Sequence, residues 1–312
     1  MVFRKDRDKA AIPMRAIIDP CEGTARAAPH DPGPGIPVRG AAVPPGRVPS
    51  QRHGRHGGNE MLVATYNVHK CQGAAGRFDP QRIAAVIAEI QADVVAVQEA
   101  DQRFGARLGL LDEADIARRA GMRLLCQSDR PGGHGWHGNA ILVREEPLAY
   151  ERRRLDLPGL EPRGAVVADL DMGKGRFRIV AAHLGLLGHS RVRQAAAILG
   201  ALAEADPLPT ILLGDLNEWR AGASALGVLE PLFGRMAGTP TFPARLPILP
   251  LDRILGWPEG VAGQPEAHNT PLARGASDHL PLKAVVRLPS GGRGRLPDNR
   301  RAAISVATAQ AA

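Results

Sequence analysis

The middle of the 312-residue chain reads NAILV (139–143), PLAYERRRL (147–155), GAVVADLD (164–171) and RFRIVAAH (176–183). Each segment is short and apolar or alternating, which is typical of β-strands. A purely doubly wound sheet needs a crossover helix between successive parallel strands, so several strands in a row exclude it. Two packed mixed sheets with helices outside fit this order better. We therefore predict an α/β four-layer sandwich.

Strands and helices alternate upstream of this run. Residues 62–67 and 93–98 predict two buried strands. Between them, Asp79 and Pro80 supply an N-cap and a first-turn proline for a helix. One apolar face is expected on that helix, made of Ile83, Val86, Ile87 and Ile90. A further helix is predicted over roughly 112–120 and a strand near 122–127.

The same alternation continues downstream. Ser190 is expected to open a helix in which Val192, Ala195, Ile198, Leu199 and Leu202 share a face. The remaining strands are predicted near residues 210–213, 252–255 and 280–287. Gly173-Lys174-Gly175 indicates a hairpin turn, because the other residues of a phosphate-binding loop are missing.

Both ends of the chain differ in composition from its middle. Residues 1–60 hold 9 Pro and 8 Gly with no hydrophobic period, so we expect a disordered extension. Alternatively, Met61 is the true start, because the folded pattern begins there. We expect one folded domain over 61–288 and a disordered Gly/Arg- and Ala-rich tail over 289–312.

The net charge of +8 is concentrated in these ends. Residues 1–60 contribute +4 and residues 289–312 contribute +3, which leaves +1 for residues 61–288. A DNA-binding body usually concentrates Lys and Arg along one groove. A nearly neutral middle and an aromatic content of only 4% therefore favour a small or lipid-type substrate over DNA.

Location and redox state follow from segments that the sequence lacks. The charged N-terminus is not followed by an apolar segment of the secretory type, and no run approaches the ~18 apolar residues of a membrane span. Three cysteines without metal-type spacing argue against a disulfide framework. We expect a cytoplasmic protein without a membrane span, monomeric by default.

Polar residues recur where the apolar strands end or begin. Such positions are rigid, and six coincidences of this kind in one chain predict a single convergent site. The residues concerned are Asn67, Glu99, His183, Asp215 with Asn217, Asp252, and Asp278 with His279.

The motifs around these residues resemble, in order, the signature of the endonuclease/exonuclease/phosphatase superfamily. They are TYNVH (65–69), QE (98–99), AAHL (181–184), GDLNEW (214–219), LDRIL (251–255) and SDHLPL (277–282). GNAIL (138–142) and EPRGA (161–165) further resemble small bacterial members. The superfamily includes DNase I-like nucleases, abasic-site endonucleases, neutral sphingomyelinases and inositol-polyphosphate 5-phosphatases. The resemblance covers residues 61–288 and implies the same four-layer fold.

The resemblance implies a Mg²⁺ site, in which Mn²⁺ can substitute. Glu99 would be the principal metal ligand, with Asn67 beside it and Asp278 as a second carboxylate. Oxygen ligands of this kind suit a hard cation.

The resemblance also implies the catalytic residues. Asp215 would orient and deprotonate the attacking water, and Asn217 would hold water or phosphate. His279 would contact a phosphoryl oxygen, with its tautomer held by Asp252. His183 would stabilise the developing negative charge.

Other residues near the motifs are weaker candidates. Secondary motifs give Asn139 and Arg163 as substrate-binding residues, and His69 with its neighbour Lys70 could reach a substrate phosphate. Cys71 is expected to be a buried, unreactive thiol. His134 and His137 lie in a glycine-rich segment that indicates a mobile loop on the substrate side.

The sequence therefore predicts a Mg²⁺-dependent phosphoesterase that hydrolyses a phosphodiester by water attack. Two alternatives stay open, a phosphomonoesterase for inositol phosphates or lipids, and a DNA-repair endo- or exonuclease. A catalytically inactive binding module would have lost one of the site residues, and none is lost.

Overall fold

The computed structural model describes residues 58–73, 76–125, 128, 130–220, 225–235, 238–289 and 304. The expectations for residues 1–57, and for the tail apart from Ile304, lie outside the described residues. Ile304 is buried in the apolar cluster beneath α3 (Gly188–Glu204) and α4 (Ala225–Phe233). At the other end, β1 (Glu60–Asn67) begins one residue before Met61, and the Asn59 carbonyl accepts a hydrogen bond from the Leu288 amide.

Two mixed sheets form the centre of the fold. The first has six strands in the order β10-β11-β1-β2-β4-β3, and the second has five in the order β5-β6-β7-β8-β9. The bounds of the first sheet are β10 (Glu266–Ala267), β11 (Leu282–Arg287), β1, β2 (Val94–Gln98), β4 (Ala140–Val143) and β3 (Arg123–Leu124). Those of the second are β5 (Ala149–Leu157), β6 (Arg163–Asp171), β7 (Arg176–His183), β8 (Thr210–Asp215) and β9 (Asp252–Trp257).

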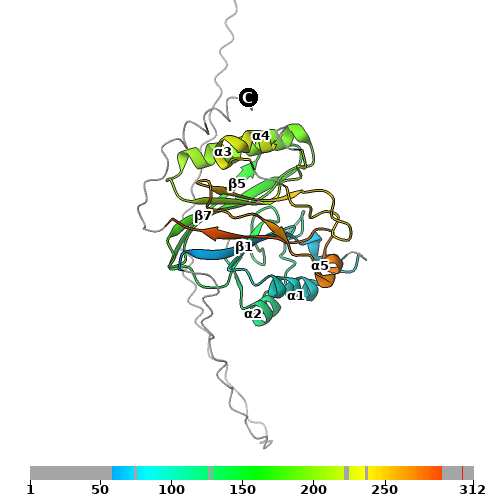
Figure 1. The fold of residues 1–312 in the computed structure, drawn as a ribbon. Coiled ribbons are helices and arrows are strands. Elements are labelled where there is room, and N and C mark those ends of the chain that lie inside the picture. The colour runs from blue at the N-terminus through cyan, green and yellow to red at the C-terminus, as the bar shows by residue number, and fades with distance from the viewer. Residues whose placement is uncertain are drawn as a thin grey trace, which may run out of the picture. The chain divides into compact units, whose positions relative to one another are not determined.

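Helices cover the outer face of each sheet (Figure 1). α3 and α4 lie over the second sheet, and α1 (Pro80–Ile90), α2 (Glu113–Ala120) and α5 (Pro271–Ala276) lie over the first. A short 3₁₀ turn, η1 (His69–Cys71), follows β1. The predicted α/β four-layer sandwich is confirmed.

Three apolar clusters separate the four layers. Along β1, Met61 and Val63 belong to the cluster between the sheets, whereas Ala64 and Tyr66 belong to the cluster under the helices. Successive strand residues point to opposite faces, so a strand between two apolar layers must be apolar throughout. This is why the central strands are continuous apolar runs.

Several local predictions are confirmed and others are wrong. Asp79 caps α1 by accepting a hydrogen bond from the Arg82 amide, and Gly173 lies in the hairpin between β6 and β7. The predicted apolar face of α1 is buried. However, α3 begins at Gly188, so Ser190 is a buried residue inside it, and Val192 of the predicted face is only half-buried.

The strand expected near 122–127 is limited to Arg123–Leu124 among the described residues. Two helices were not predicted. α4 contains Pro231, which masks its pattern, and α5 is only six residues long, too short for a helical period to show.

The strand registers bring the polar residues to one edge of the sandwich. Asn67 pairs with Gln98 across parallel strands, and His183 pairs with Asp215 in the same way. Asp252 begins an antiparallel strand and therefore pairs with Asp215, which ends its own. Strand ends and strand beginnings thus meet at the same place.

Candidate active site

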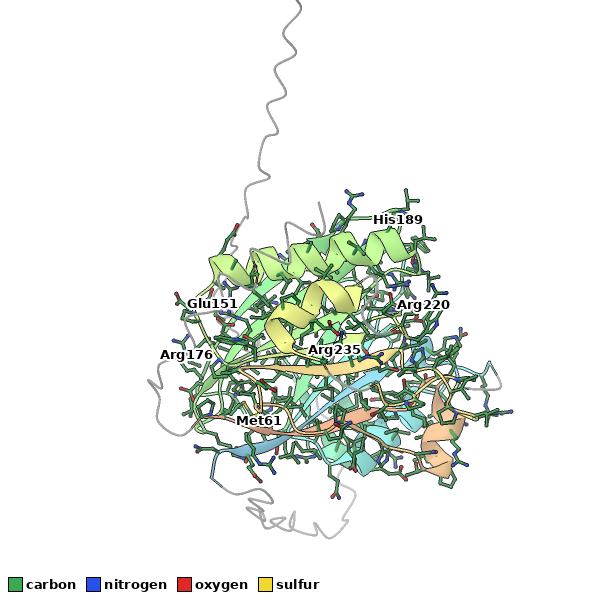
Figure 2. All side chains as sticks on the ribbon, turned by 45° about the horizontal axis from the view of Figure 1, so that its top comes forward. Met61, Glu151, Arg176, His189, Arg220 and Arg235 are labelled. Carbon is green, nitrogen blue, oxygen red and sulfur yellow. The ribbon has the colours of Figure 1, made fainter. Side chains whose placement is uncertain are left out.

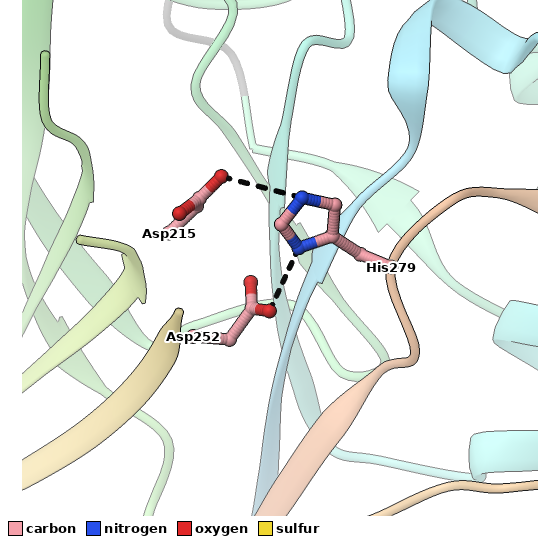
Figure 3. A group of neighbouring side chains, drawn as sticks. All are labelled: Asp215, Asp252 and His279. Atoms are coloured by element: carbon pink, nitrogen blue, oxygen red, sulfur yellow. Dashed lines mark hydrogen bonds and ion pairs between the residues drawn. The ribbon is translucent and has the colours of Figure 1, made fainter. Parts of the chain in front are cut away.

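His279 lies between two buried carboxylates (Figure 3). Its Nδ1 is 2.8 Å from Asp252 Oδ2, and its Nε2 is 3.6 Å from Asp215 Oδ2. His183 Nε2 approaches the same Asp215 oxygen at 3.4 Å. We call Asp252, His279, Asp215 and His183 the buried relay, because each member contacts the next and none is more than 5% exposed.

Neighbouring residues fix the far end of the buried relay. Thr241 Oγ1 donates to Asp252 Oδ2 over 2.5 Å, and the Phe242 ring packs at 4.9 Å from the His279 ring. The sequence analysis did not identify Thr241, because the segment TPTFP around it bears no resemblance to a catalytic motif. Its backbone carbonyl accepts from the Leu280 amide, which connects the two loops.

Asp215 is held by two further donors. Asn67 Nδ2 donates to Oδ2 over 2.9 Å, and the Asn217 amide donates to Oδ1 over 2.9 Å. Asn217 in turn donates its Nδ2 to the Leu184 carbonyl. Burial raises the pKa of Asp215 to about 6, and the neighbouring Asp252 adds to the rise, while His279 and the hydrogen bonds from Asn67 and Asn217 oppose it. The carboxylate is therefore more basic than an ordinary aspartate but still ionised at neutral pH.

The two histidines of the relay are driven in opposite directions. Burial lowers the pKa of His183 well below its usual value, and the positive charges of Arg163 and His279 lower it further. Burial also disfavours the charged form of His279, but Asp252 outweighs it, with help from Asp215 and Asp278, and raises the pKa to about 10. At neutral pH the site thus contains one neutral and one cationic imidazole.

A second group of polar residues is open to solvent. We call Glu99, Asp278, Lys70 and His69 the open half of the site, because their side chains are 23–41% exposed. Lys70 Nζ lies 3.7 Å from Glu99 Oε2, and His69 Nδ1 lies 3.7 Å from Asp278 Oδ1.

Asn67 connects the open half to the buried relay. Its Oδ1 accepts from the His69 amide over 3.0 Å, while its Nδ2 holds Asp215. Its carbonyl accepts from Ser277 Oγ over 2.7 Å, which fixes the loop that carries Asp278 and His279.

The backbone around the site is strained. His69, Lys70 and Cys71 have φ values of 45°, 52° and 58°, and Glu99 and Asn217 have 56° and 51°. Positive φ is uncommon for residues other than glycine and costs roughly 1–3 kcal/mol in unfavourable cases. Glu99 directly follows β2, and the other strained residues lie two to four residues after β1 or β8, so the strain is concentrated where the strands end.

A small cleft opens beside the relay. Acidic and basic side chains both line the cleft. Its lining residues are Lys70, Glu99, Asp101, Arg103, His137, Gly138, Pro162, Arg163 and His183. Arg163 is 8% exposed and is held by Glu161 at 2.9 Å, while its Nε has no hydrogen-bond partner among the described residues. Neither Asp101 nor Arg103 stands in one of the sequence motifs used above.

Three of the weaker candidates are buried in the fold. Asn139 is fully buried and donates Nδ2 to the Gly164, Trp136 and His137 carbonyls, so it braces the loop, while its Oδ1 has no hydrogen-bond partner among the described residues. His134 is also buried, and its Nε2 lies 3.1 Å from the Leu111 amide, which contradicts the expectation of a mobile position. Cys71 is buried, and burial raises the pKa of its thiol to about 12, as expected for an unreactive cysteine.

Asp215, Asp252 and His279 form the one cluster of potential metal ligands found among the described residues, with ligand atoms within 4.8 Å of one another. However, the 2.8 Å contact between His279 and Asp252 requires a proton between the two atoms. A histidine with a raised pKa is also a poor ligand, because metals bind the neutral ring. This cluster is better described as a hydrogen-bonded Asp252–His279 pair with Asp215 beside it than as a metal cage.

The model of the endonuclease/exonuclease/phosphatase family matches residues 64–279, more than half of the chain. The chain belongs to this family, whose members are hydrolytic phosphoesterases that generally use a divalent metal.

One relative in sequence supports the assignment, and solved structures share the fold. The uncharacterized protein YbhP of Escherichia coli strain K12 is 31% identical over 246 residues, which cover 72% of this chain and 96% of YbhP. The mannosyl-6-phosphatase Bt3783 of Bacteroides thetaiotaomicron has a TM-score of 0.54 at 20% identity, covering 72% of this chain and 99% of Bt3783.

A third similar structure is D. rerio TDP2 in complex with a single-stranded DNA product. Its TM-score is 0.52 at 19% identity, covering 72% of this chain and 98% of TDP2. At 19–20% identity, the likeness of Bt3783 and TDP2 to this chain is one of fold. Among the described residues, no helix is long and apolar enough to cross a membrane.

Proposed function

We propose that this protein is a Mg²⁺-dependent phosphodiesterase that hydrolyses a small or lipid-type phosphodiester by water attack. The observation that supports it most directly is the buried relay, which places a basic carboxylate between a neutral and a cationic imidazole. Hydrolysis of an unactivated phosphate ester needs a positioned base and stabilisation of the charge that develops on the phosphoryl group. The relay and the adjoining cleft offer both.

The open half fits a divalent cation. Glu99 Oε2 is buried and no described residue gives it a hydrogen bond, although Lys70 stands 3.7 Å away. Carboxylates and amide oxygens are the ligands that Mg²⁺ prefers. Glu99 and Asp278 would hold the ion with Asn67 beside them, and once bound it neutralises charge on the substrate phosphate.

Asp215 is the base in this proposal. Two hydrogen bonds fix its orientation, and its raised pKa lets it accept a proton from an attacking water at neutral pH. Asn217 holds the carboxylate through its backbone amide, a positioning role beside the predicted contact with water or phosphate.

His279 and His183 have separate tasks. His279 keeps its proton on Nδ1 through Asp252, so Nε2–H is free to donate to a phosphoryl oxygen. His183 is neutral and lines the cleft, where it can donate one hydrogen bond without adding charge. Arg163 lines the same cleft with an unpaired Nε and is suited to clamp a phosphate oxygen.

A phosphomonoesterase is the second candidate. Lys70, Arg103 and Arg163 all line the cleft, and three cations would suit the extra negative charge of a monoester. The similarity to a mannosyl-6-phosphatase points in the same direction. The nuclease alternative is supported by the likeness to TDP2, at the level of the fold.

The deciding experiment is hydrolysis of bis-(p-nitrophenyl) phosphate against p-nitrophenyl phosphate, each with Mg²⁺ and after chelation. We expect Mg²⁺-dependent release from the diester, at least tenfold faster than from the monoester. Faster turnover of the monoester would establish the second candidate. Full activity after chelation would overturn the metal requirement. An Asp215→Asn preparation serves as the control for contaminating phosphatases.

A further inference from the structure

Large apolar side chains gather on loops at the active-site end. Phe104 is 71% exposed, Leu160 82%, Leu186 64%, Leu187 43% and Trp219 46%. We call these five residues the apolar rim. Exposed apolar groups scattered singly need no explanation, but a group of them on adjoining loops marks an interaction surface.

Ion pairs and hydrogen bonds join the loops of the apolar rim. Glu161 accepts from Arg103 over 3.1 Å, from the Leu186 amide over 2.9 Å and from Arg163 over 2.9 Å. Arg103 adjoins Phe104, and Glu161 adjoins Leu160. The Glu161 carboxylate therefore joins three segments of the apolar rim, those that carry Phe104, Leu160 and Leu186.

A second contact adds the fourth segment. Arg191 donates to the Leu186 carbonyl and to Glu218 Oε2, which is next to Trp219. The rim also borders the cleft, because Arg103 and Arg163 line it. Leu186 lies three residues after His183, and Trp219 lies two residues after Asn217.

The charge of these segments is one-sided. In the described residues 102–109, 158–163, 184–193 and 216–220, the acidic residues are Glu161 and Glu218, and both are engaged in ion pairs. Exposed basic side chains remain at Arg193 and Arg220, with His189 beside them. His189 and Arg220 lie at one end of the molecule and Glu151 and Arg176 at the other (Figure 2).

We propose that the apolar rim docks on an anionic phospholipid surface and brings the cleft to the phosphodiester of a lipid headgroup. The inference rests on the proposed phosphodiesterase function and names its substrate class. Leucines and a tryptophan beside basic residues are what peripheral proteins insert at the headgroup boundary, and nearby basic residues add attraction to an anionic leaflet.

Single-stranded nucleic acid fits the rim less well. Binding of bases requires aromatic stacking platforms, and only Phe104 and Trp219 of the five are aromatic. Leu160, Leu186 and Leu187 have no stacking face, but they are well suited to insertion among acyl chains. The lipid surface is therefore the partner that uses the whole rim.

The test measures vesicle binding without catalysis. Full-length protein in EDTA is sedimented with vesicles of 30% phosphatidylglycerol in phosphatidylcholine, and with pure phosphatidylcholine. We expect strong binding to the first only, and a loss of about tenfold or more in affinity for Leu186→Ser/Leu187→Ser. Leu148→Ser is the matched control, because Leu148 is 77% exposed but lies immediately before β5, where its amide donates to the Asp171 carbonyl at the β6–β7 hairpin.

Tryptophan fluorescence gives an independent signal. Trp219 is the exposed one of the three tryptophans, since Trp257 is 4% exposed and Trp136 is half-buried. A blue shift on adding anionic vesicles, lost in Trp219→Phe while sedimentation persists, would place the rim in the lipid. Equal binding by the leucine double variant and wild type would overturn the proposal.

The outcomes separate this inference from the proposed function. If the wild type hydrolyses the soluble diester but does not bind vesicles, the lipid-docking proposal is wrong and the proposed function stands. The same holds if the protein prefers an oligodeoxynucleotide and the leucine substitutions block that binding. Vesicle binding without hydrolysis of any diester would contradict the proposed function and leave the surface standing. The double variant should keep its rate on the soluble diester and lose at least tenfold on vesicular phosphatidylglycerol.

Discussion

The buried relay and the open half use the same residue types under opposite conditions. In the relay, Asp215 and His279 are almost inaccessible, and their neighbours shift their pKa values to about 6 and about 10. In the open half, Glu99 and Asp278 keep 23% and 38% of their side chains exposed.

This difference shows which chemical task suits each half of the site. Removal of water strengthens electrostatic coupling, so a buried carboxylate and histidine can tune each other's protonation. A partly exposed carboxylate stays accessible, as a ligand for an incoming cation must be. The predictions below test this division.

The largest effect should come from the relay base. Asp215→Asn keeps the shape but removes the basic oxygen, and we expect kcat on the soluble diester to fall about 10³–10⁴-fold. Asp101→Asn is the matched control. Burial also raises the pKa of Asp101 to about 6, but its Oδ2 accepts from the Gly138 amide, and among the described residues no hydrogen bond or ion pair joins it to either histidine of the relay. It should lose less than about tenfold. Equal losses would show that a raised pKa in the cleft, and not the relay, matters.

Next in size, Asp252 and His279 should act as one unit. Each alanine variant should lose about 10²–10⁴-fold in kcat, and the double variant scarcely more than the worse single one, because removing one partner leaves the other misoriented. A double-mutant cycle measures this coupling, with circular dichroism to confirm folding. Multiplicative losses would mean that the 2.8 Å contact between them has no catalytic role.

The open half should respond through metal demand. Glu99→Gln should raise the Mg²⁺ concentration for half-maximal rate by about 10–100-fold while leaving a measurable rate at saturating Mg²⁺, because it removes one ligand charge. A Mg²⁺ titration of rate measures it, and Asp215→Asn should show the reverse, a lower maximum with little change in the titration midpoint. A lower maximum with an unchanged midpoint for Glu99→Gln would assign the metal elsewhere.

The pH dependence should reveal the relay alone. Asp215 must be ionised, and its pKa is raised to about 6, so kcat/KM should rise with pH through that region. His279 must be protonated, and its pKa is raised to about 10, so the rate should fall only in the alkaline range. Asp252→Asn removes the main group that raises the pKa of His279. The alkaline limb of the residual activity should then move down by about one unit or more. An unmoved limb would assign that ionisation to another group.

The smallest effect should come from the support of the relay. Thr241→Val removes the hydroxyl that donates to Asp252 and keeps the side-chain volume. One hydrogen bond is worth about 0.5–1.5 kcal/mol, so we expect a loss of about two- to tenfold in kcat. Thr239 lies on the same segment as Thr241, and its hydroxyl donates to the Pro265 carbonyl. Thr239→Val should therefore cause a smaller loss in kcat than Thr241→Val. A larger loss at Thr239 would mean that loop stability, and not the bond to Asp252, explains both.

Much of the fold could be predicted from local sequence patterns. Unbroken apolar strands, the Asp79-Pro80 helix start and the run of consecutive strands predict two sheets with helices outside, because side-chain period and burial are local properties. The same strands show their polar ends, which is why Asn67, Glu99, His183 and Asp215 could be grouped before their distances were known. Helix α5 and the start of α3 could not be predicted, since short or uncapped helices leave a weak signal.

Tertiary structure alone decided what each grouped residue experiences. His183 and His279 are the same residue type and both are buried, yet one is neutral and the other cationic, because of the two only His279 is bonded to Asp252. Asn139 became a brace when the chain folded its amide against Gly164, and the apolar rim formed only when Glu161 joined segments up to 58 residues apart. The sequence determined which side chains stand at strand ends, since strand period is local. Protonation, access to solvent and the joining of distant loops depend on fields and contacts between residues far apart in the chain, and these exist only in the folded molecule.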